Sequence, residues 1–286
     1  MDRMSGKRVL ITGASSGIGL AAAAALAGMG AEVLMHVRDV GRGERARLSI
    51  AEATGNERTE LLVADFADLE AVRRMAGECL RRYDRIDVLV ANAGAIHPER
   101  RVTAQGNELT FQVNHLAHFL LCREIEPLLA ASAPSRVIAV SSDAHWAAWR
   151  GLRLRDPSFD RGWSPFGAYA HSKLANIMFC YEHARRLSGT GVTSTVMHPG
   201  LVRSGFGAAG YGVFGRLIHR VSPMIAATPE EGADTIVWLA SSAEVEGVTG
   251  VYFYHRRPHR SAPASRDVAA QRGLWELSER LTSVGN

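Results

Sequence analysis

Residues 8–19, RVLITGASSGIG, decide how the chain begins to fold. Arg8–Thr12 is a short apolar run, typical of a buried strand, and an alanine-rich stretch at 17–27 has the composition of a helix. The glycine-rich turn between them lets the backbone approach a ligand closely, and the N-terminus of the following helix attracts a phosphate group. Its glycines follow the spacing Gly-x-x-x-Gly-x-Gly. We therefore predict a nucleotide site here, with a turn that binds no ligand as the alternative.

Short apolar runs alternate with longer helical patterns along the rest of the chain. We expect further strands at 32–37, 60–64, 87–91, 136–141, 192–197 and 251–254. We expect the other helices at 43–53, 69–82, 109–130, 168–187 and 230–240. Because the strands are apolar throughout rather than at alternate positions, they indicate a parallel sheet covered on both faces. We therefore predict one α/β domain over residues 1–286, a doubly wound parallel sheet in a three-layer α/β/α arrangement.

Two long stretches interrupt this alternation, and each follows the end of a strand. Residues 143–167 are rich in tryptophan and arginine, and residues 201–227 carry five glycines among aromatic and aliphatic side chains. Ligands bind at the carboxyl ends of the strands in open α/β sheets, so we interpret both stretches as substrate loops with an apolar lining. The alternative is that these side chains only pack beneath the loops. The glycines of the second stretch would suit a lid.

The composition excludes several classes of protein. The chain has 286 residues, 47% of them hydrophobic and 22% charged, which suits a globular protein rather than a disordered one. The net charge is only +4 and the basic residues are scattered, so we expect no nucleic acid as a partner. Cys79, Cys122 and Cys180 lack the spacing of a metal site, so we expect free thiols and no bound metal. No run near the start reaches the ~20 apolar residues that span a bilayer. We therefore expect a cytoplasmic protein without stable membrane insertion.

A tyrosine and a lysine lie four residues apart near the start of the helix expected at 168–187. Residues at that spacing share one helical face, so Tyr169 and Lys173 can point into the same pocket. A neighbouring ammonium favours the phenolate and lowers the pKa of a tyrosine from its usual value of about 10. That makes Tyr169 usable as a proton donor or acceptor near neutrality. Since the chain has only two lysines among 33 basic residues, we favour a catalytic pair over a surface pair.

Two serines, Ser141 and Ser142, stand where the strand expected at 136–141 ends. A hydroxyl at that edge of the sheet can hydrogen-bond a substrate carbonyl oxygen and stabilise the charge that develops on it. Serines at a strand end are also common as a loop start or a helix cap. Taken alone, the two serines do not decide between a catalytic and a structural role.

Together these motifs resemble the short-chain dehydrogenase/reductase family over residues 7–254. The family's catalytic set is matched by Ser142, Tyr169, Lys173 and Asn114. Its cofactor site is matched by Gly13, Ser15, Ser16, Gly17, Ile18, Gly19, Arg38, Asp65, Phe66, Asn92, Ala93, Gly94, Tyr169, Lys173, Pro199, Gly200, Val202 and Ser204. Ala91 stands where a second asparagine is common, and Ser204 stands where threonine is usual. The resemblance implies a Rossmann fold and a hydride transfer between a nicotinamide cofactor and an alcohol or carbonyl group.

Within the family, the phrases VNHLAHFLL, SSDAH and YAHSKLAN resemble the branch of retinol dehydrogenase and protochlorophyllide reductase. That branch has a long insertion between its catalytic serine and tyrosine, and the 27 residues from Ser142 to Tyr169 fit it. The resemblance implies that Tyr169 protonates the carbonyl oxygen while Ser142 hydrogen-bonds it. It also implies that Lys173 supports Tyr169 and holds the nicotinamide ribose. Asn114 would position a water that links the lysine to solvent.

The end of the second expected strand decides which cofactor is preferred. An acidic residue there would accept hydrogen bonds from the ribose 2′-hydroxyl of NAD, whereas a basic one would pair with the 2′-phosphate of NADP. Val37 occupies the position where NAD-preferring relatives carry Asp, and Arg38 follows it. We therefore expect NADP to be preferred over NAD, although Asp39 would favour NAD if the strand ended later. Asp65 and Phe66 resemble the pair that holds the adenine, with a loop cap as the alternative for Asp65.

We thus expect an NADP(H)-dependent oxidoreductase that acts on an apolar or aromatic small molecule, as a ketone or aldehyde reductase. One alternative is a non-redox epimerase or dehydratase on the same fold. The other is a regulatory protein that senses NADP without turnover. The intact catalytic set argues against both. The resemblance also implies a homodimer or homotetramer packed through the two long helices.

Overall fold

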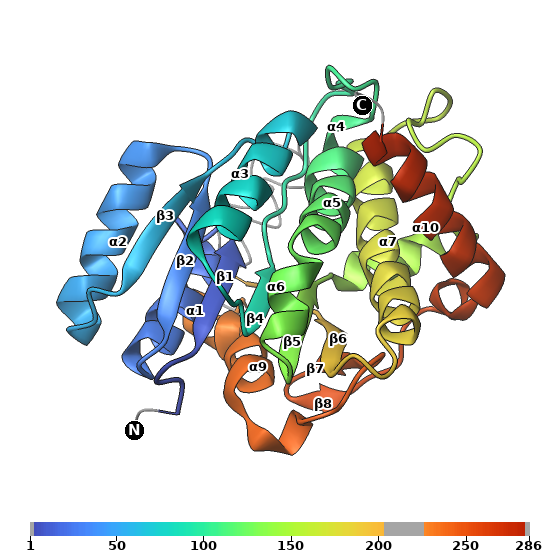
Figure 1. Ribbon diagram of the computed structural model, residues 1–286. Coiled ribbons are helices and arrows are strands. Elements are labelled where there is room, and N and C mark those ends of the chain that lie inside the picture. The colour runs from blue at the N-terminus through green and yellow to red at the C-terminus, as the bar shows by residue number, and fades with distance from the viewer. Residues whose placement is uncertain (1–2, 203–225, 284–286) are drawn as a thin grey trace.

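The computed structural model describes residues 3–202 and 226–283, and one eight-stranded sheet runs through them (Figure 1). The strands are β1 (Arg8–Thr12), β2 (Glu32–Val37), β3 (Thr59–Val63), β4 (Val88–Ala91), β5 (Ser135–Val140), β6 (Val192–Met197), β7 (Tyr252–Tyr254) and β8 (Arg257–Pro258). Their order across the sheet is β3-β2-β1-β4-β5-β6-β7-β8. β1 to β7 are parallel, and β8 runs antiparallel to β7. Since the strand order reverses between β1 and β4, the crevice for a ligand lies above the carboxyl ends of these strands.

Helices cover both faces of this sheet and produce three layers (Figure 1). One face carries α1 (Gly17–Gly28), α2 (Val40–Thr54) and α9 (Pro229–Ser241), which share a core with the sheet. The other face carries α3 (Leu69–Arg82), α5 (Ala117–Glu124), α7 (Pro165–Arg186) and α10 (Val268–Ser283) around a second core. Shorter helical pieces are α4 (Leu109–Phe111), η1 (Gln112–Leu116), α6 (Glu126–Ala131), η2 (Asp143–Ala148), η4 (Ala243–Val245) and η5 (Pro263–Arg266). The doubly wound α/β prediction is therefore confirmed.

The long helix expected at 109–130 is wrong as a single element. The segment divides into α4, a π-helical turn η1, α5 and α6. Pro127 explains the last division, because its ring removes an N–H donor and clashes with the carbonyl four residues earlier. Two other helices begin three residues before their predicted starts at 43 and 168, because a capping side chain precedes each of them. Asp39 caps α2 at Val40, and Ser164 caps α7 at Pro165.

The sequence analysis missed α10, which packs against α5 and α7 (Figure 1). Its Trp275 is 2% exposed and lies against Phe119 and Phe179, with ring centroids 5.0 and 5.9 Å away. Ser278 on the same helix lies 2.9 Å from His115 Nε2. α10 therefore covers part of the face of α5 and α7 through which subunits were expected to pack. The expected homo-oligomer stays a prediction, with α10 as part of any contact on this face.

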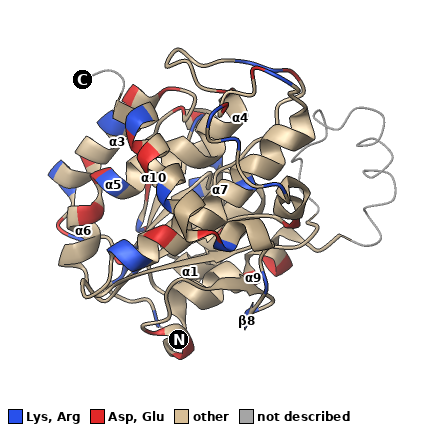
Figure 2. Ribbon diagram, turned by 90° about the vertical axis from the view of Figure 1, so that its right-hand side faces the viewer, with Lys and Arg blue, Asp and Glu red and all other residues tan. Residues whose placement is uncertain are grey.

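The surface of the described residues carries charges of both signs. Figure 2 shows Lys and Arg interspersed with Asp and Glu along the helices. In the same described ranges, no helix has the length and apolar character needed to cross a membrane. The three cysteines are free and buried, as expected, and burial raises the pKa of each thiol to about 12. Their thiols therefore stay protonated and unreactive at physiological pH.

Candidate active site

The turn after β1 and the first turn of α1 contain two glycines, Gly13 and Gly19, at positions where any side chain would clash. Gly13 adopts φ +68°, and a Cβ there would lie 3.0 Å from the Cα of Ala93. A Cβ at Gly19 would lie 2.5 Å from Asn92 Nδ2 and closer still to the carbonyl oxygen of Gly13. Such contacts are too short for any side chain, so glycine is required for the turn to pack this closely on itself and against the segment after β4. This glycine cradle opens helix α1, a position that suits the pyrophosphate of a dinucleotide.

The N-terminus of α1 also suits an anion. Ser16 occupies its N-cap position but makes no hydrogen bond from its side chain to the helix. By contrast, Asp39, Asp68 and Thr228 cap α2, α3 and α9 with their side chains. The first N–H groups of α1 are thus left for another acceptor, and a phosphate at a helix N-terminus provides one.

The segment after β4 is held against this turn by Thr12. The hydroxyl oxygen of Thr12 accepts hydrogen bonds from the backbone N–H groups of Asn92 (2.8 Å) and Ala93 (2.9 Å). The side-chain amide of Asn92 donates to the carbonyl of Thr12 at 2.8 Å. Gly94 follows, and a Cβ there would lie 3.4 Å from Lys173 Nζ. The structure therefore brings the expected Asn92–Gly94 segment between the glycine turn and Lys173.

Arg38 and Asp39 have different surroundings at the end of β2. The carboxylate of Asp39 accepts a 2.7 Å hydrogen bond from the backbone N–H of Arg42 and so caps α2. Arg38 is exposed directly after the last residue of the strand, Val37. Because β2 ends at Val37, the later strand end that would have favoured Asp39 is not found. The carboxylate that could contact a ribose thus has a structural role through its Oδ1 atom.

Asp65 and Phe66, the pair expected to hold the adenine, differ in exposure and in their contacts. Asp65 is exposed, and its carboxylate accepts a 2.9 Å hydrogen bond from Ala67 N, as a loop cap does. Phe66 is 3% exposed and its ring stacks on His36 at 4.1 Å. A contact from Phe66 to a ligand must therefore use its backbone. His36 in turn lies 3.2 Å from Gly13 N through Nδ1 and 3.0 Å from the Ala64 carbonyl through Nε2.

Tyr169 and Lys173 lie one turn apart on α7, near its capped start. Both are buried, and Lys173 Nζ lies 5.6 Å from the centroid of the Tyr169 ring. The ammonium donates a 3.0 Å hydrogen bond to the carbonyl of Val140 at the end of β5. Burial lowers the pKa of Lys173 to about 8. The two residues of the expected catalytic pair therefore lie together at the carboxyl end of β5, as their spacing in the sequence predicted.

Ser142 lies beyond the carboxyl end of β5, two residues after Val140. Its hydroxyl oxygen accepts a 3.2 Å hydrogen bond from Ala144 N, which makes Ser142 the cap of η2. That bond does not use the hydroxyl proton, so Ser142 can still donate to a substrate oxygen. Ser141 has the structural role of the two, because its hydroxyl donates to the carbonyl of Lys173 at 2.8 Å. Ser142 thus caps a helix and keeps a hydroxyl proton for a substrate, and its catalytic role stays a prediction.

Asn114 is buried in the π-helical turn η1, beside the lysine. Its side-chain oxygen accepts from Ala95 N at 2.7 Å. Its amide nitrogen donates to Ala95 O and to Ser172 Oγ, both at 2.9 Å. The side chain of Asn114 therefore holds the loop after Gly94 in place, and its main-chain carbonyl lies 3.0 Å from His118 Nδ1.

The segment after β6 completes the site from the other side. Gly200 adopts φ +75° beside the ring of Tyr254, where a Cβ would lie 3.5 Å away. Val202 and Ile18 both pack against Gly232 of α9, which places the loop beside the first turn of α1. Ser204 and most of the expected loop 201–227 lie outside the described residues.

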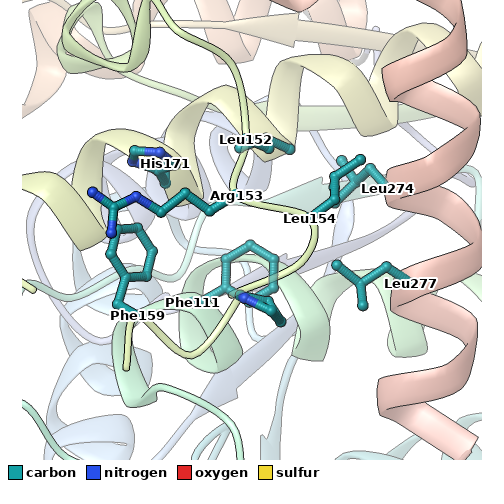
Figure 3. Close-up of a pocket in the computed structure, with 9 residues that line it drawn as sticks. Phe111, Leu152, Arg153, Leu154, Phe159, His171, Leu274 and Leu277 are labelled. Carbon is teal, nitrogen blue, oxygen red and sulfur yellow. The ribbon is translucent and has the colours of Figure 1, made fainter. Parts of the chain in front are cut away.

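Part of the other expected substrate loop packs against helices. Residues Leu152, Leu154 and Phe159 close a small apolar cavity together with Leu274 and Leu277 of α10 (Figure 3). The cavity volume is about 10 Å³, which is room for one water at most. Along this part of the loop, the packing alternative is therefore correct.

Sequence reasoning missed three histidines that organise the site, namely His36, His118 and His198. His118 could have been found by its spacing, since it follows Asn114 by four residues on a helix. His198 directly precedes the expected Pro199 segment, and His36 lies within a predicted strand. Each is buried and polar in an otherwise apolar stretch, which is a signal worth pursuing.

The fold and this site define a nicotinamide-dependent oxidoreductase, and comparison with known proteins agrees. Residues 7–153 match the family described as short chain dehydrogenase. The chain belongs to that family, and within it to the retinol dehydrogenase-like branch. It is 41% identical to mouse retinol dehydrogenase 14 over 98% of this chain and 87% of the relative.

Two solved structures extend the comparison. A crystal structure of an uncharacterised protein from Mycobacterium paratuberculosis has a TM-score of 0.77 and 32% identity, covering 98% of this chain and 94% of that one. A gluconate 5-dehydrogenase-like protein from Beutenbergia cavernae, solved with bound NADP, has a TM-score of 0.69 and 30% identity. That match covers 88% of this chain and 96% of the other. The enzyme class follows: an oxidoreductase that acts on CH–OH or C=O groups.

Proposed function

We propose that the protein is an NADP(H)-dependent reductase of aldehydes or ketones carried by large apolar small molecules. The position of Lys173 supports this most strongly. Its ammonium lies beside the Tyr169 ring on one side and against Gly94 of the cofactor segment on the other. One cation can therefore serve the group that handles the proton and the group that carries the nucleotide.

The residues divide the chemistry among them. When bound, the nicotinamide supplies or accepts a hydride at the carbonyl carbon. Tyr169 gives a proton to the carbonyl oxygen, and Ser142 donates a hydrogen bond to that oxygen as charge develops on it. Lys173 favours the phenolate that Tyr169 becomes and holds the nicotinamide ribose. The carbonyl of Val140 fixes the lysine for both tasks.

Arg38 supports the preference for NADP. It is exposed at the strand end where the adenosine ribose lies in this fold, and the neighbouring carboxylate of Asp39 is engaged in a helix cap. A guanidinium suits a 2′-phosphate because its planar fork donates two parallel hydrogen bonds. The NADP bound in the Beutenbergia cavernae relative agrees with this choice.

The substrate class rests on exposed apolar side chains near the site. Trp146 and Trp149 lie in the segment after Ser142, Phe166 lies at the start of α7, and Leu201 follows Gly200; all four are more than 40% exposed. Side chains of this kind favour an extended apolar or aromatic substrate. The retinol dehydrogenases among the relatives are named for such an alcohol.

The test begins with fluorescence titrations of the purified protein with NADPH and with NADH. Tighter binding of NADPH is expected, followed by oxidation of NADPH in the presence of retinal or an aromatic ketone. Tyr169→Phe should bind NADPH normally and lose turnover, because only the proton donor is removed. Tyr181→Phe is the matched control, since it removes a hydroxyl from the same helix that bonds Ser261 instead.

Two results would overturn the proposal. If the protein binds neither nucleotide, it has lost the cofactor site. If Tyr169→Phe turns over carbonyl compounds as fast as the unmodified protein, another residue donates the proton. The cytoplasmic location remains a separate prediction.

A further inference from the structure

His118 of α5 connects two parts of the site that lie far apart in sequence. It is 4% exposed, and its Nε2 lies 2.8 Å from the hydroxyl of Thr12 at the end of β1. Its Nδ1 lies 3.0 Å from the main-chain carbonyl of Asn114 in η1. The ring therefore spans the distance between the cofactor turn and the turn beside the catalytic lysine.

The partners of His118 determine where its proton lies. A carbonyl oxygen can only accept, so Nδ1 must carry the hydrogen that bonds Asn114. Burial lowers the pKa of His118 to about 3, so the ring is neutral and Nε2 has no hydrogen. Nε2 is then an acceptor, and the Thr12 hydroxyl donates to it. Hydrogen bonds thus run in one direction, from Thr12 through His118 to Asn114.

This direction leaves Thr12 free to accept elsewhere. With its hydrogen committed to His118, the Thr12 oxygen has two lone pairs, and they accept from Asn92 N and Ala93 N. At the other end, Asn114 Oδ1 accepts from Ala95 N. Thr12 and Asn114 thus hold the two ends of the segment 92–95. His118 is the bridge between them, and Gly94 lies in the middle of the segment, against Lys173.

We propose that His118 is a positioning residue, which fixes the segment 92–95 against Lys173 and so couples cofactor binding to proton delivery. The inference rests on the proposed function, because it concerns the lysine and the cofactor segment that this function uses. His118 touches neither cofactor nor substrate in this account. It acts through Thr12 and Asn114.

The test uses His118→Leu, which keeps a buried side chain but removes both hydrogen bonds. The Asn114 carbonyl would lose its partner, and Thr12 would turn its hydroxyl toward Val90 O, which lies 3.3 Å away. We expect NADPH affinity and kcat each to fall about tenfold, the loss that one misplaced hydrogen bond of about 1.4 kcal/mol produces. The KM for the carbonyl substrate should stay within about twofold, since His118 does not reach the substrate side.

Two further variants separate positioning from simple stability. His118→Gln can donate from its amide nitrogen to Asn114 and accept from Thr12 with its oxygen, so it should restore most of the lost affinity and kcat. Ser278→Ala is the matched control. Ser278 of α10 is fully buried and pairs with Nε2 of His115, so its loss breaks a buried histidine hydrogen bond without involving Thr12 or Asn114. That variant should lower thermal stability and leave NADPH affinity and kcat of the folded enzyme unchanged.

Several outcomes would overturn the inference. One is a His118→Leu protein that folds and shows unchanged NADPH affinity and kcat. Another is that His118→Leu and Ser278→Ala reduce both quantities equally. If the unmodified protein binds NADPH but reduces no carbonyl compound, the proposed function fails, while the NADPH affinities of the variants still test the bridge. If it binds neither nucleotide, both proposals fall.

Discussion

His198 Nε2 lies 3.1 Å from the Oδ2 atom of Asp143, so the loops that follow β5 and β6 contact each other through this pair. Asp143 comes directly after Ser142, the proposed hydrogen-bond donor to the substrate, and His198 comes directly before Pro199 of the segment proposed to hold the nicotinamide. His198 is 1% exposed and its Nδ1 lies 2.6 Å from the hydroxyl of Tyr252. Contact with His198 also holds the pKa of Asp143 below its usual range. The pair joins the substrate side of the site to its cofactor side.

Replacement of Asp143 by Ala should therefore loosen both loops. Because the carboxylate is largely exposed, its loss should cost about 0.2–1 kcal/mol, or up to about a fivefold fall in kcat/KM for the carbonyl substrate. Asp143→Asn keeps an oxygen beside His198 Nε2 and should retain activity. Steady-state kinetics at saturating NADPH measure both. Equal losses in the two variants would show that charge, rather than the contact, matters.

The exposure of Arg38 predicts a change of cofactor preference. Arg38→Glu should weaken NADPH binding by about 10- to 100-fold, because a charge-assisted hydrogen bond to phosphate contributes about 1.5–3 kcal/mol and a carboxylate repels it. NADH affinity should be unchanged or improved. Arg45→Glu places the same charge on α2 farther from the strand end and serves as the control. If both variants weaken NADPH equally, the effect comes from net charge and Arg38 has no specific role.

Much of the fold follows from apolar runs that are self-contained. β1, β2, β6 and α3 have the bounds predicted from sequence, since each is a compact run ended by a glycine, a cap or a charged residue. α10 was missed because its buried residues, among them Leu274 and Trp275, are few and alternate with charged ones. These residues are buried by α5 and α7, which lie far from α10 in the sequence, so the α10 segment alone does not indicate that they are buried.

The proximity of Tyr169 and Lys173 could be predicted because the two residues share one turn of a helix. Ser142 lies near them because it follows β5 directly beyond Ser141. The links through His118 and His198 could not be predicted, because each joins residues more than 50 positions apart. A histidine also needs its partners in place before its donor and acceptor atoms can be assigned. Such residues become interpretable only when the topology brings their partners together.

Gly19 tests whether the cofactor cradle depends on its missing side chain. Gly19→Ala would place a Cβ 2.5 Å from Asn92 Nδ2 and even closer to backbone at Gly13, so the turn must shift. We expect loss of NADPH binding together with a lower melting temperature. Gly28→Ala lies near the end of the same helix, where a Cβ would meet only Thr54 Cγ2 at 3.6 Å. That control should bind NADPH normally and could gain up to about 1 kcal/mol from helix propensity.

Lys173 sets a pH dependence whose sign follows from burial. Its pKa is lowered to about 8 in the folded protein, against about 10.4 for an unfolded lysine. Between these values the unfolded chain holds more protons than the native one, so the free energy of unfolding from this group rises with pH from about 8 to about 10.4.

The catalytic activity should instead fall over the same pH range. Above pH 8 the native lysine loses the charge that supports Tyr169, so kcat/KM for carbonyl reduction should fall. Thermal melts and kinetics from pH 6 to 10 measure both trends, with Lys173→Met as the comparison. That variant should lack the rise in stability, and a wild-type kcat/KM that stays flat through pH 8 to 10 would contradict the role given to the lysine charge.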